Sequence, residues 1–559
     1  MKLYKEVLKK YKKLIIFYVL IGIIVNFLNV FEVDLFQRII DSFDGDLSIT
    51  LIIIFGIVML VNLVVGYIEN YPEQQLQKGL PLSFKLQALK KMKTIDYLEY
   101  QKLGTGLITE RVNEGSEAAS NNLINFHFKL VRYLLPTALF SLLYIAIIDL
   151  KLLLFVALGY VLVMIVTKIL LKKLYSVKEK VLTNQEMLNK HLLRGFMELV
   201  IFRTNKKYDS EIKITEKGIK NIVDGKTRIK MIHEIFFTAF GILVGILKVI
   251  MLLYAFYSKS LTIGEIVAII TLLGKAYEPI AIFNVEYIDY KLNKQAVDKF
   301  IKLLDLKDVS NIDSGLKLKK LDGNIELKNI DYSYENKKVL NNVSLKIKSG
   351  SYVAFVGTTG SGKSTLIKLI SGLIKTKKGE VLVDGTNLNE IDLNSYYDHV
   401  SYLSQDSVIF DGTLKENIVF DKKVSDEEIE KVLGLVCLED FYKKLPDGLD
   451  TNLGEKGILV SGGERQRIGL ARLFFDKANV VILDEATSQV DNITEKVVMK
   501  NINNYLENKT LIVIAHRLNT IENADEIFIV LNGKVIDSGK YDDLKRNNEY
   551  FEELTRKRE

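Results

Sequence analysis

Hydrophobic residues gather in six long stretches in the first half of the chain. Each stretch holds about 20 residues with few charges, and a helix of that length crosses the ~30 Å hydrocarbon core of a bilayer. The predicted spans are residues 14–33, 49–68, 130–149, 152–171, 235–257 and 262–282. We therefore expect an all-α transmembrane domain of six helices within residues 1–305.

The second half alternates between apolar and polar positions in short runs. Runs with a period of two lie at residues 325–330, 345–347 and 352–356, and this period is typical of β-strands. We expect a polar linker over residues 306–322, followed by an α/β domain over residues 323–559. The pattern as a whole predicts a multidomain membrane protein.

Lysine and aspartate are distributed unevenly around the predicted spans. Six lysines and one glutamate precede the first span, whereas four aspartates and one arginine follow it. Because positively charged loops stay in the cytoplasm, we expect the N-terminus and the second half of the chain on the cytoplasmic side of the cell membrane. The first apolar run is longer than a signal peptide needs, and no cleavage site follows it. The polar connections at 69–129 and 172–234 predict helices that continue beyond the bilayer.

Composition narrows the class of protein. The 559 residues are 48% hydrophobic and include one cysteine and 5 prolines, which excludes a disordered chain, a disulfide scaffold and a collagen-like repeat. The mean hydropathy of +0.15 is then the average of a membrane domain and a soluble domain. The net charge of +7 raises nucleic acid as a partner. Since its clearest contribution is the lysine-rich N-terminus, we expect a lipid bilayer and no nucleic acid.

Polar residues inside the predicted spans are costly and therefore indicate functional positions. They are Lys248, Lys275, Glu278, Asn26, Asn29 and Asn62. One hypothesis is that they line a cavity for a transported substrate. The alternatives are a pair between Lys275 and Glu278 on one helix, or lysine side chains that extend toward the interface.

The apolar run at 352–356 leads directly into a glycine-rich loop and a helix. The loop residues are Gly357, Thr358, Thr359, Gly360, Ser361, Gly362, Lys363, Ser364 and Thr365. Glycines let backbone N–H groups turn toward phosphate oxygens, and the helix that follows directs its positive end to the same place. We expect Lys363 to reach the terminal phosphates of ATP and the Ser364 hydroxyl to bind Mg²⁺.

A second apolar run, at 480–483, ends in two carboxylates. We expect Asp484 to support Mg²⁺, through water, and Glu485 to act as the general base on an attacking water. Together with the phosphate-binding loop, these two residues predict ATP hydrolysis.

Between these two motifs lies a segment that identifies a family. Val460, Ser461, Gly462, Gly463 and Glu464 open an amphipathic helix. The segment resembles the signature of ATP-binding cassette (ABC) transporters, and the order of the two halves resembles an exporter-type half-transporter. That resemblance implies that Ser461, Gly462, Gly463 and Glu464 close on ATP held by the phosphate-binding loop of a second subunit. A dimer, either homodimeric or heterodimeric, is therefore expected.

The resemblance assigns further residues to the nucleotide site. It implies that Tyr334 stacks on adenine, that Gln405 senses Mg²⁺ and water, and that His516 contacts the γ-phosphate. It places Asp491 in a loop that crosses the dimer, and residues 106–111 and 454–457 at contacts between the cassette and the membrane domain. Val460, Glu464 and the pair Gln489 and Val490 differ from the residues usual in the family.

The resemblance implies ATP-driven export of an amphipathic or hydrophobic solute, peptide or lipid by alternating access. An importer of the same fold, or one half of a heterodimeric peptide or multidrug exporter, stays open as an alternative. A soluble cassette protein is disfavoured by the six spans. A built-in cysteine protease is disfavoured because Cys437, the single cysteine, lies inside the cassette.

Overall fold

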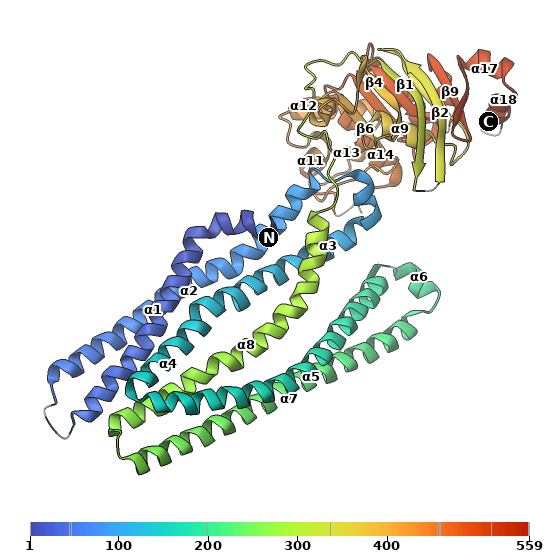
Figure 1. The fold of residues 1–559 in the computed structure, drawn as a ribbon. Coiled ribbons are helices and arrows are strands. Elements are labelled where there is room, and N and C mark those ends of the chain that lie inside the picture. Colours follow the sequence, from blue (N-terminus) through green and yellow to red (C-terminus); the bar gives the residue numbers. More distant parts are fainter. Residues whose placement is uncertain are drawn as a thin grey trace. The chain divides into compact units, whose positions relative to one another are not determined.

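The computed structural model describes residues 2–559 apart from 44, 46, 198, 336, 455, 456, 458, 459, 516 and 557–559. Inside helices it describes the backbone alone at residues 2, 3, 164, 166, 167, 169, 170, 197, 518 and 519. The chain forms two compact units, one of Met1–Lys93 with Leu103–Leu306 and one of Thr94–Lys102 with Lys307–Glu559 (Figure 1). The first unit is helical, and the second contains all the strands.

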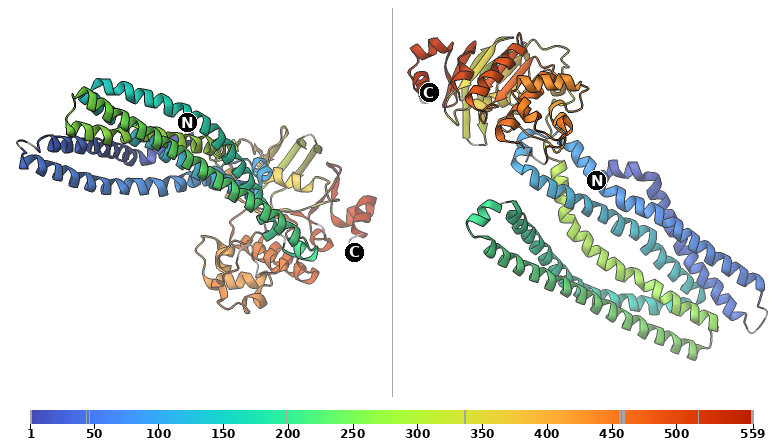
Figure 2. Two further views of the ribbon diagram at one scale, coloured as in Figure 1. Left: turned by 90° about the horizontal axis from the view of Figure 1, so that it is seen from below. Right: turned by 180° about the vertical axis from the view of Figure 1, so that it is seen from behind.

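Long helices build the first unit (Figures 1 and 2). They are α1 (Lys2–Asp41), α2 (Ile49–Met92), α3 (Tyr97–Asn121), the π-helices η1 (Asn122–Phe128) and η2 (Leu130–Leu134), α4 (Leu135–Ile148), α5 (Leu150–Met197), the short α6 (Leu199–Thr204), α7 (Tyr208–Ser258) and α8 (Ile263–Leu304). Helices α5 and α7 lie side by side as a long antiparallel hairpin (Figure 2). The helical continuation predicted for residues 172–234 is thereby confirmed, with the turn of the hairpin at α6.

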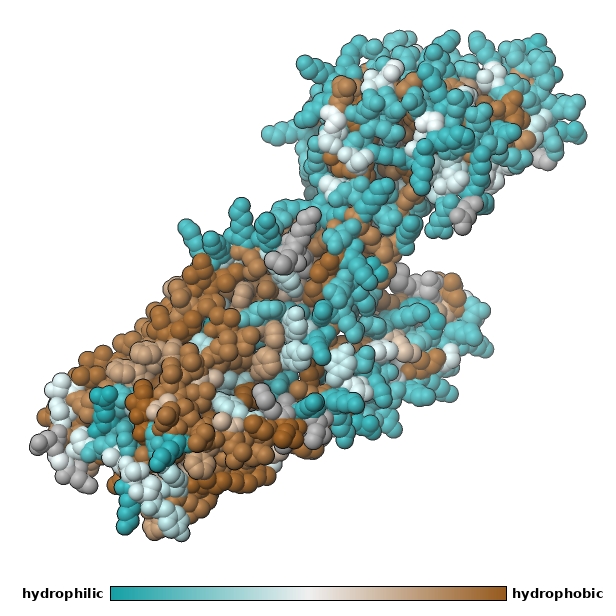
Figure 3. All heavy atoms as spheres, in the orientation of Figure 1, coloured by the Kyte–Doolittle hydropathy of each residue, from teal (hydrophilic) through white to brown (hydrophobic). Residues whose placement is uncertain are grey.

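Apolar side chains cover much of the visible surface of these helices (Figure 3). Within the described residues, five helices are long and apolar enough to cross a membrane, and a shorter apolar helical stretch runs from Leu150 to Val163. The predicted span at 152–171 lies in α5, and some of its side chains fall outside the described residues. The other five predicted spans agree with these five helices to within one residue, and the span at 130–149 lies in the continuous helical run Tyr97–Ile148, which joins α3, η1, η2 and α4.

The interior of the first unit is packed around Tyr277 of α8, which is fully buried. Its hydroxyl donates to the carbonyl of Val156 at 2.6 Å. Gly159, one turn further along α5, makes room for the ring, because a Cβ atom there would lie 2.0 Å from the Tyr277 hydroxyl. A glycine on one helix thus lets an aromatic residue of another reach the backbone of the first.

Five of the six polar residues named inside the predicted spans form hydrogen bonds to another helix. The Asn62 amide donates to Asn29 at 3.1 Å, and the Lys275 ammonium donates to the Asn29 carbonyl at 3.3 Å. Glu278 accepts a hydrogen bond from the Tyr133 hydroxyl at 2.9 Å. No ion pair within 4.0 Å joins Lys275 and Glu278 among the described residues, and each side chain binds a residue of another helix.

Buried Asn26 also links two helices. Its amide donates to the Arg132 carbonyl at 3.1 Å, and its side-chain oxygen accepts from Thr137 at 2.5 Å. Such interhelical hydrogen bonds hold membrane helices together. Lys248 is half-buried in α7, and its predicted role in lining a substrate cavity stays a prediction.

Two β-sheets form the framework of the second unit (Figure 1). The first has the order β2-β1-β4-β5, and the second has the order β10-β9-β3-β8-β7-β6. The strands are β1 (Ile325–Tyr334), β2 (Lys337–Ile347), β3 (Tyr352–Val356), β4 (Lys378–Val383), β5 (Thr386–Asn387), β6 (Val400–Leu403), β7 (Val480–Asp484), β8 (Thr510–Ile514), β9 (Glu526–Leu531) and β10 (Lys534–Gly539). In the second sheet only the pair β9 and β10 is antiparallel.

Helices pack around these sheets and carry the predicted motifs. They are α9 (Lys363–Ile370), α10 (Leu393–Tyr397), α11 (Leu414–Val419), α12 (Asp426–Leu435), α13 (Glu439–Tyr442), α14 (Gly462–Ala471), α15 (Asn492–Tyr505), α16 (Leu518–Ile521), α17 (Tyr541–Asn547) and α18 (Glu549–Arg556). Strands β3 and β7 both pair with β8 in parallel, so their carboxyl ends lie at one edge of the sheet. Ligands of open α/β sheets bind at this edge.

A short segment, Thr94–Lys102, which includes the start of α3, belongs to the second unit. The Asp96 N–H donates to the Lys307 carbonyl at 2.9 Å, and the Val309 N–H donates to the Thr94 carbonyl at 2.8 Å. The Lys368 ammonium lies 5.6 Å from the centre of the Tyr97 ring. Residues 94–102 therefore pack with the α/β fold, whereas residues 106–111, predicted as a contact segment, lie in the first unit.

Candidate nucleotide-binding site

The phosphate-binding loop runs from the end of β3 into α9, as the sequence predicts. Gly357, Gly360 and Gly362 have φ angles of 150°, 80° and 111°. At Gly357 the backbone of another strand also approaches closely, because a Cβ atom there would lie 2.1 Å from the Val530 carbonyl oxygen. The glycine is therefore required by both its conformation and its neighbour.

The polar groups of the loop are arranged to receive an anion. Lys363 is 5% exposed, and its ammonium donates to the carbonyls of Gly357 and Thr358 at 3.1 and 2.9 Å. The Ser361 hydroxyl is buried and has no hydrogen-bond partner among the described residues. Buried polar groups in proteins are nearly always paired, so this orphaned hydroxyl fits a loop that closes around phosphate oxygens.

A cavity of about 550 Å³ opens over this loop. Its wall contains these residues singled out from the sequence: Tyr334, Thr359, Gly360, Gly362, Lys363, Ser364, Thr365 and Glu485. The structure adds Lys337, Lys338, Val339, Asn532 and Gly533, which come from β2 and from the turn between β9 and β10. Sequence reasoning missed these five because no local pattern marks them, and only the sheet order brings them to the loop.

Asp484 and Glu485 follow β7 at the same edge. Asp484 is 8% exposed, and burial raises the pKa of its carboxyl group, while a hydrogen bond from the Tyr402 hydroxyl at 3.2 Å opposes that rise. A divalent cation would stabilise the ionised carboxylate in this setting. Asp484 is thus suited to the Mg²⁺-supporting role that the sequence suggests.

Glu485 has a strained backbone and a defined side-chain partner. Its φ angle is +53°, a left-handed conformation that costs a non-glycine residue about 1–3 kcal/mol and is concentrated at functional sites. The Gln405 amide donates to the Glu485 carboxylate at 2.7 Å. Glu485 was predicted from its place at the end of an apolar strand and Gln405 from the family resemblance, and the structure brings the two side chains into contact.

The signature segment begins α14 with a capping box. Ser461 is the N-cap, and its N–H and hydroxyl both donate to the Glu464 carboxylate, at 2.8 and 2.6 Å. Gly462 and Gly463 pack against Gln489, since Cβ atoms on the two glycines would lie 2.0 and 2.9 Å from its side-chain and backbone oxygens. Of the described residues that line the 550 Å³ cavity, none belongs to this segment.

Gln466, one turn further along α14, connects three predicted motifs. Its side-chain amide donates to the Gln405 carbonyl at 3.2 Å and to the Ser488 hydroxyl at 2.9 Å. Its side-chain oxygen accepts from the Gln489 N–H at 2.7 Å. The residue is buried, and sequence reasoning missed it because its partners lie more than 20 positions away.

The buried carboxylate of Glu495 binds side chains of the segment that follows β8. Glu495 is 1% exposed and accepts hydrogen bonds from Thr487 at 2.6 Å and from Thr520 at 2.9 Å. Arg517 forms an ion pair with it at 2.9 Å and donates to the Ser488 carbonyl at 3.0 Å. This network joins the segment after Glu485 to the segment that carries His516.

Asp491 is a predicted site residue that does not line the cavity. Asp491 caps α15, where its carboxylate accepts from the Thr494 N–H at 3.0 Å. His516 lies outside the described residues, as do parts of the segment at 454–457. Their predicted roles stay predictions.

Comparisons with known proteins agree with this site. Residues 340–488 match the family model described as ABC transporter. The chain is 39% identical over 292 residues to an ATP-dependent lipid A-core flippase of Francisella novicida, covering 51% of this chain and 49% of the relative. It is 35% identical over 288 residues to an uncharacterized ABC transporter ATP-binding protein of Bacillus subtilis, covering 51% and 50%. These matches span about half the length of the curated relatives.

A solved structure extends the likeness to the whole fold. The structure of a bacterial Atm1-family ABC exporter with ATP bound superposes with a TM-score of 0.82, covers 98% of both chains and is 21% identical in sequence. At this identity the likeness concerns the fold, which combines a helical membrane domain with an α/β cassette. Residues 340–488 therefore belong to the ABC transporter family and form a nucleotide-binding cassette, C-terminal to helices that have the exporter fold.

Proposed function

We propose that this protein is an exporter subunit that hydrolyses ATP to move a substrate across the cell membrane. One observation carries the proposal: Lys363 and Glu485 both line the cavity over the phosphate-binding loop, and the described part of the same chain includes five helices of membrane-spanning length. A phosphate-binding site with a carboxylate on its wall is suited to ATP hydrolysis. The membrane-spanning helices provide the part of the protein through which hydrolysis can drive transport.

Each residue at this site has a separate role in ATP binding or hydrolysis. Lys363 turns from its own loop carbonyls to the terminal phosphates, while Tyr334 packs on the adenine ring. Glu485 accepts the proton of the attacking water, oriented by the Gln405 amide. Mg²⁺, held by Ser364, Gln405 and Asp484, would neutralise phosphate charge. His516 completes the site beside the γ-phosphate.

A second subunit is part of the proposal. The segment from Ser461 to Glu464 does not line the cavity of its own chain, yet it is a helix N-terminus with bare glycine amides, which attracts anions. The exporter fold supports a dimer in which each signature closes on the ATP of the other subunit. Both a homodimer and a heterodimer satisfy this arrangement.

Transport follows from closing and opening this dimer. Binding of two ATP molecules draws the cassettes together and turns the helices outward, and hydrolysis releases them. The lysine distribution supports a cytoplasmic N-terminus and cytoplasmic cassettes. The substrate is an amphipathic or hydrophobic solute, peptide or lipid, a range that includes the lipid named in the Francisella relative.

Substitution of the general base tests the proposal. Glu485→Gln should bind ATP with a Kd within about threefold of the wild type and lose at least about 100-fold in the rate of phosphate release. Glu507→Ala, an exposed carboxylate in the same cassette, is the matched control and should leave the rate unchanged. Undiminished phosphate release by Glu485→Gln would overturn the assignment.

Import is the competing direction. Inside-out membrane vesicles that contain the protein separate the two, because an exporter accumulates substrate in their lumen when ATP is added. Loss of preloaded substrate from the lumen on ATP addition would indicate import.

A further inference from the structure

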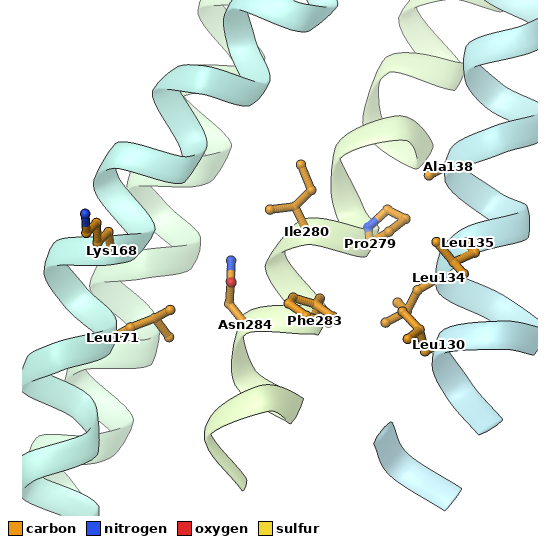
Figure 4. A pocket seen from close by; sticks show the side chains of 10 residues that line it. All are labelled: Leu130, Leu134, Leu135, Ala138, Lys168, Leu171, Pro279, Ile280, Phe283 and Asn284. Atoms are coloured by element: carbon orange, nitrogen blue, oxygen red, sulfur yellow. The ribbon is translucent and has the colours of Figure 1, made fainter. Parts of the chain in front are cut away.

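A second cavity, of about 450 Å³, lies among helices of the first unit (Figure 4). Side chains from η2, α4, α5 and α8 line it, and Leu134, Leu135, Ala138 and Phe283 are among its apolar walls. The polar residues on its wall are Lys168 and Asn284. The cavity is therefore an apolar space with a single positive charge.

Helix geometry gives the depth of this cavity in the membrane. Counting from the outer ends of α4 and α8 at a rise of 1.5 Å per residue, Ala138 lies about 15 Å deep and Asn284 about 31 Å deep. The hydrocarbon core is ~30 Å thick. In the proposed orientation, the cavity therefore occupies the half of the bilayer next to the cytoplasm.

The positive charge lies near the level of the cytoplasmic headgroups. Lys168 is about 27 Å from the outer end of α5, and Lys172, one turn further on the same face, is about 33 Å from it. Both lysines are exposed, and no ion pair to either occurs among the described residues. The apolar space therefore lies deeper in the bilayer, and the positive charge lies at the level of the headgroups. The acyl chain and the phosphate of a lipid have the same order along the membrane normal.

We propose that this cavity binds one acyl chain of an anionic lipid from the cytoplasmic leaflet, with the lipid phosphate beside Lys168. The lipid is then the substrate class of the proposed export, and in that respect the inference rests on the proposed function. A peptide fits less well, because its backbone groups would lack partners against apolar walls. A cationic amphiphile would be repelled by Lys168.

The absence of tryptophan from the sequence allows a direct binding test. Phe283→Trp places a single tryptophan on the cavity wall, and Leu135→Trp is a second reporter if the first fails to fold. Phosphatidylglycerol brominated in its acyl chains should quench the fluorescence of the detergent-solubilised protein, saturating at one lipid per chain. Brominated phosphatidylcholine should bind about fivefold more weakly, since one lysine near the headgroup accounts for roughly that factor.

Two further substitutions identify the site. Lys168→Gln in the reporter background should remove the preference for phosphatidylglycerol. Ala138→Phe fills the cavity and should abolish saturable quenching, whereas Leu139→Phe, on an exposed neighbouring position of α4, should not. Equal quenching by the two lipids, or saturable quenching that survives Ala138→Phe, would overturn the proposal.

ATP turnover in the same preparations distinguishes this inference from the proposed function. Phosphatidylglycerol should stimulate phosphate release by the Leu139→Phe protein and not by the Ala138→Phe protein. Saturable lipid binding without any phosphate release would leave the lipid site in place and refute the ATP-driven export. Phosphate release without saturable binding would refute the lipid site alone.

Discussion

The side-chain amide of Gln405 donates a 2.7 Å hydrogen bond to the carboxylate of Glu485, 80 positions further along the chain. Glu485 also has the strained φ angle of +53°. One residue therefore orients the proposed general base, while the backbone that carries the base is held in a conformation that few residues adopt. Orientation of Glu485 thus depends on the loop after β6 as well as on β7.

Removal of this amide should slow hydrolysis more than it weakens ATP binding. Gln405→Ala removes this hydrogen bond to Glu485, and loss of such an orienting contact costs roughly 10–100-fold in activity. We expect kcat for ATP to fall within that range while the Kd for ATP, measured by calorimetry, changes by less than about threefold. An unchanged kcat would show that Glu485 needs no orientation by Gln405.

The charge of Glu464 should oppose closure of the dimer. Its carboxylate lies at the N-terminus of α14, where it accepts from the N–H and hydroxyl of Ser461. Glu464→Gln keeps the capping box and removes the negative charge from a position that must approach phosphate. A charge at a helix terminus contributes about 0.3–1 kcal/mol, so ATP-dependent association should strengthen roughly two- to fivefold.

Cross-linking of the cassettes in the full-length protein monitors dimer closure. The quantity to compare is the ATP concentration at which closure is half-maximal. Glu416→Gln is a matched control, because Glu416 occupies the same position in the capping box of α11, outside the signature. Tighter closure by both variants, or by neither, would contradict the electrostatic role of Glu464.

Glu495 should contribute to the stability of the cassette through its buried network. Glu495→Ala leaves the hydroxyls of Thr487 and Thr520 and the Arg517 guanidinium without their shared acceptor. Removing one partner of a buried pair costs about 3 kcal/mol. We expect a loss of this order in the free energy of opening of β7 and β8, measured by amide hydrogen exchange on the full-length protein.

Exposed Glu507, near the end of α15, again provides the control. Its replacement by alanine should change the free energy of opening by less than about 0.5 kcal/mol. If the two substitutions lowered the free energy of opening equally, the network around Glu495 would stabilise the cassette no more than an exposed carboxylate does.

Asp331 should make the stability of the first sheet depend on pH. Hydrogen bonds from Lys378 and Lys338, together with the Asn342 N–H, hold the pKa of its carboxyl group well below the usual range. A depressed pKa in the folded state stabilises the fold above the ordinary pKa of aspartate, about 3.9. This contribution disappears as the pH falls through the lower, folded-state pKa.

Asp331→Asn should therefore lower the Tm of the full-length protein at pH 7 and have a progressively smaller effect below about pH 4. Thermal unfolding of both proteins across this pH range is the measurement. A difference in Tm that stays constant down to pH 3 would contradict the ionic origin of the effect.

Several parts of this protein follow from local sequence alone. An apolar run of about 20 residues has few alternatives to a membrane-spanning helix, because the length of the run matches the thickness of the bilayer. The phosphate-binding loop is equally local, since the glycines, Lys363 and Ser364 act through the backbone of nine consecutive residues. The same holds for the capping box from Ser461 to Glu464, which closes within one helical turn.

Tertiary structure alone decided the contacts that join these local motifs. The hydrogen bond between Gln405 and Glu485, the buried amide of Gln466 and the docking of residues 94–102 on the α/β fold each join positions far apart in the chain. The order of strands and the packing of helices determine which distant residues meet, and hydrophobic periodicity does not encode that order. The cavity beside Lys168 exists for the same reason, because its walls come from helices whose apolar faces are indistinguishable in sequence from those that face lipid.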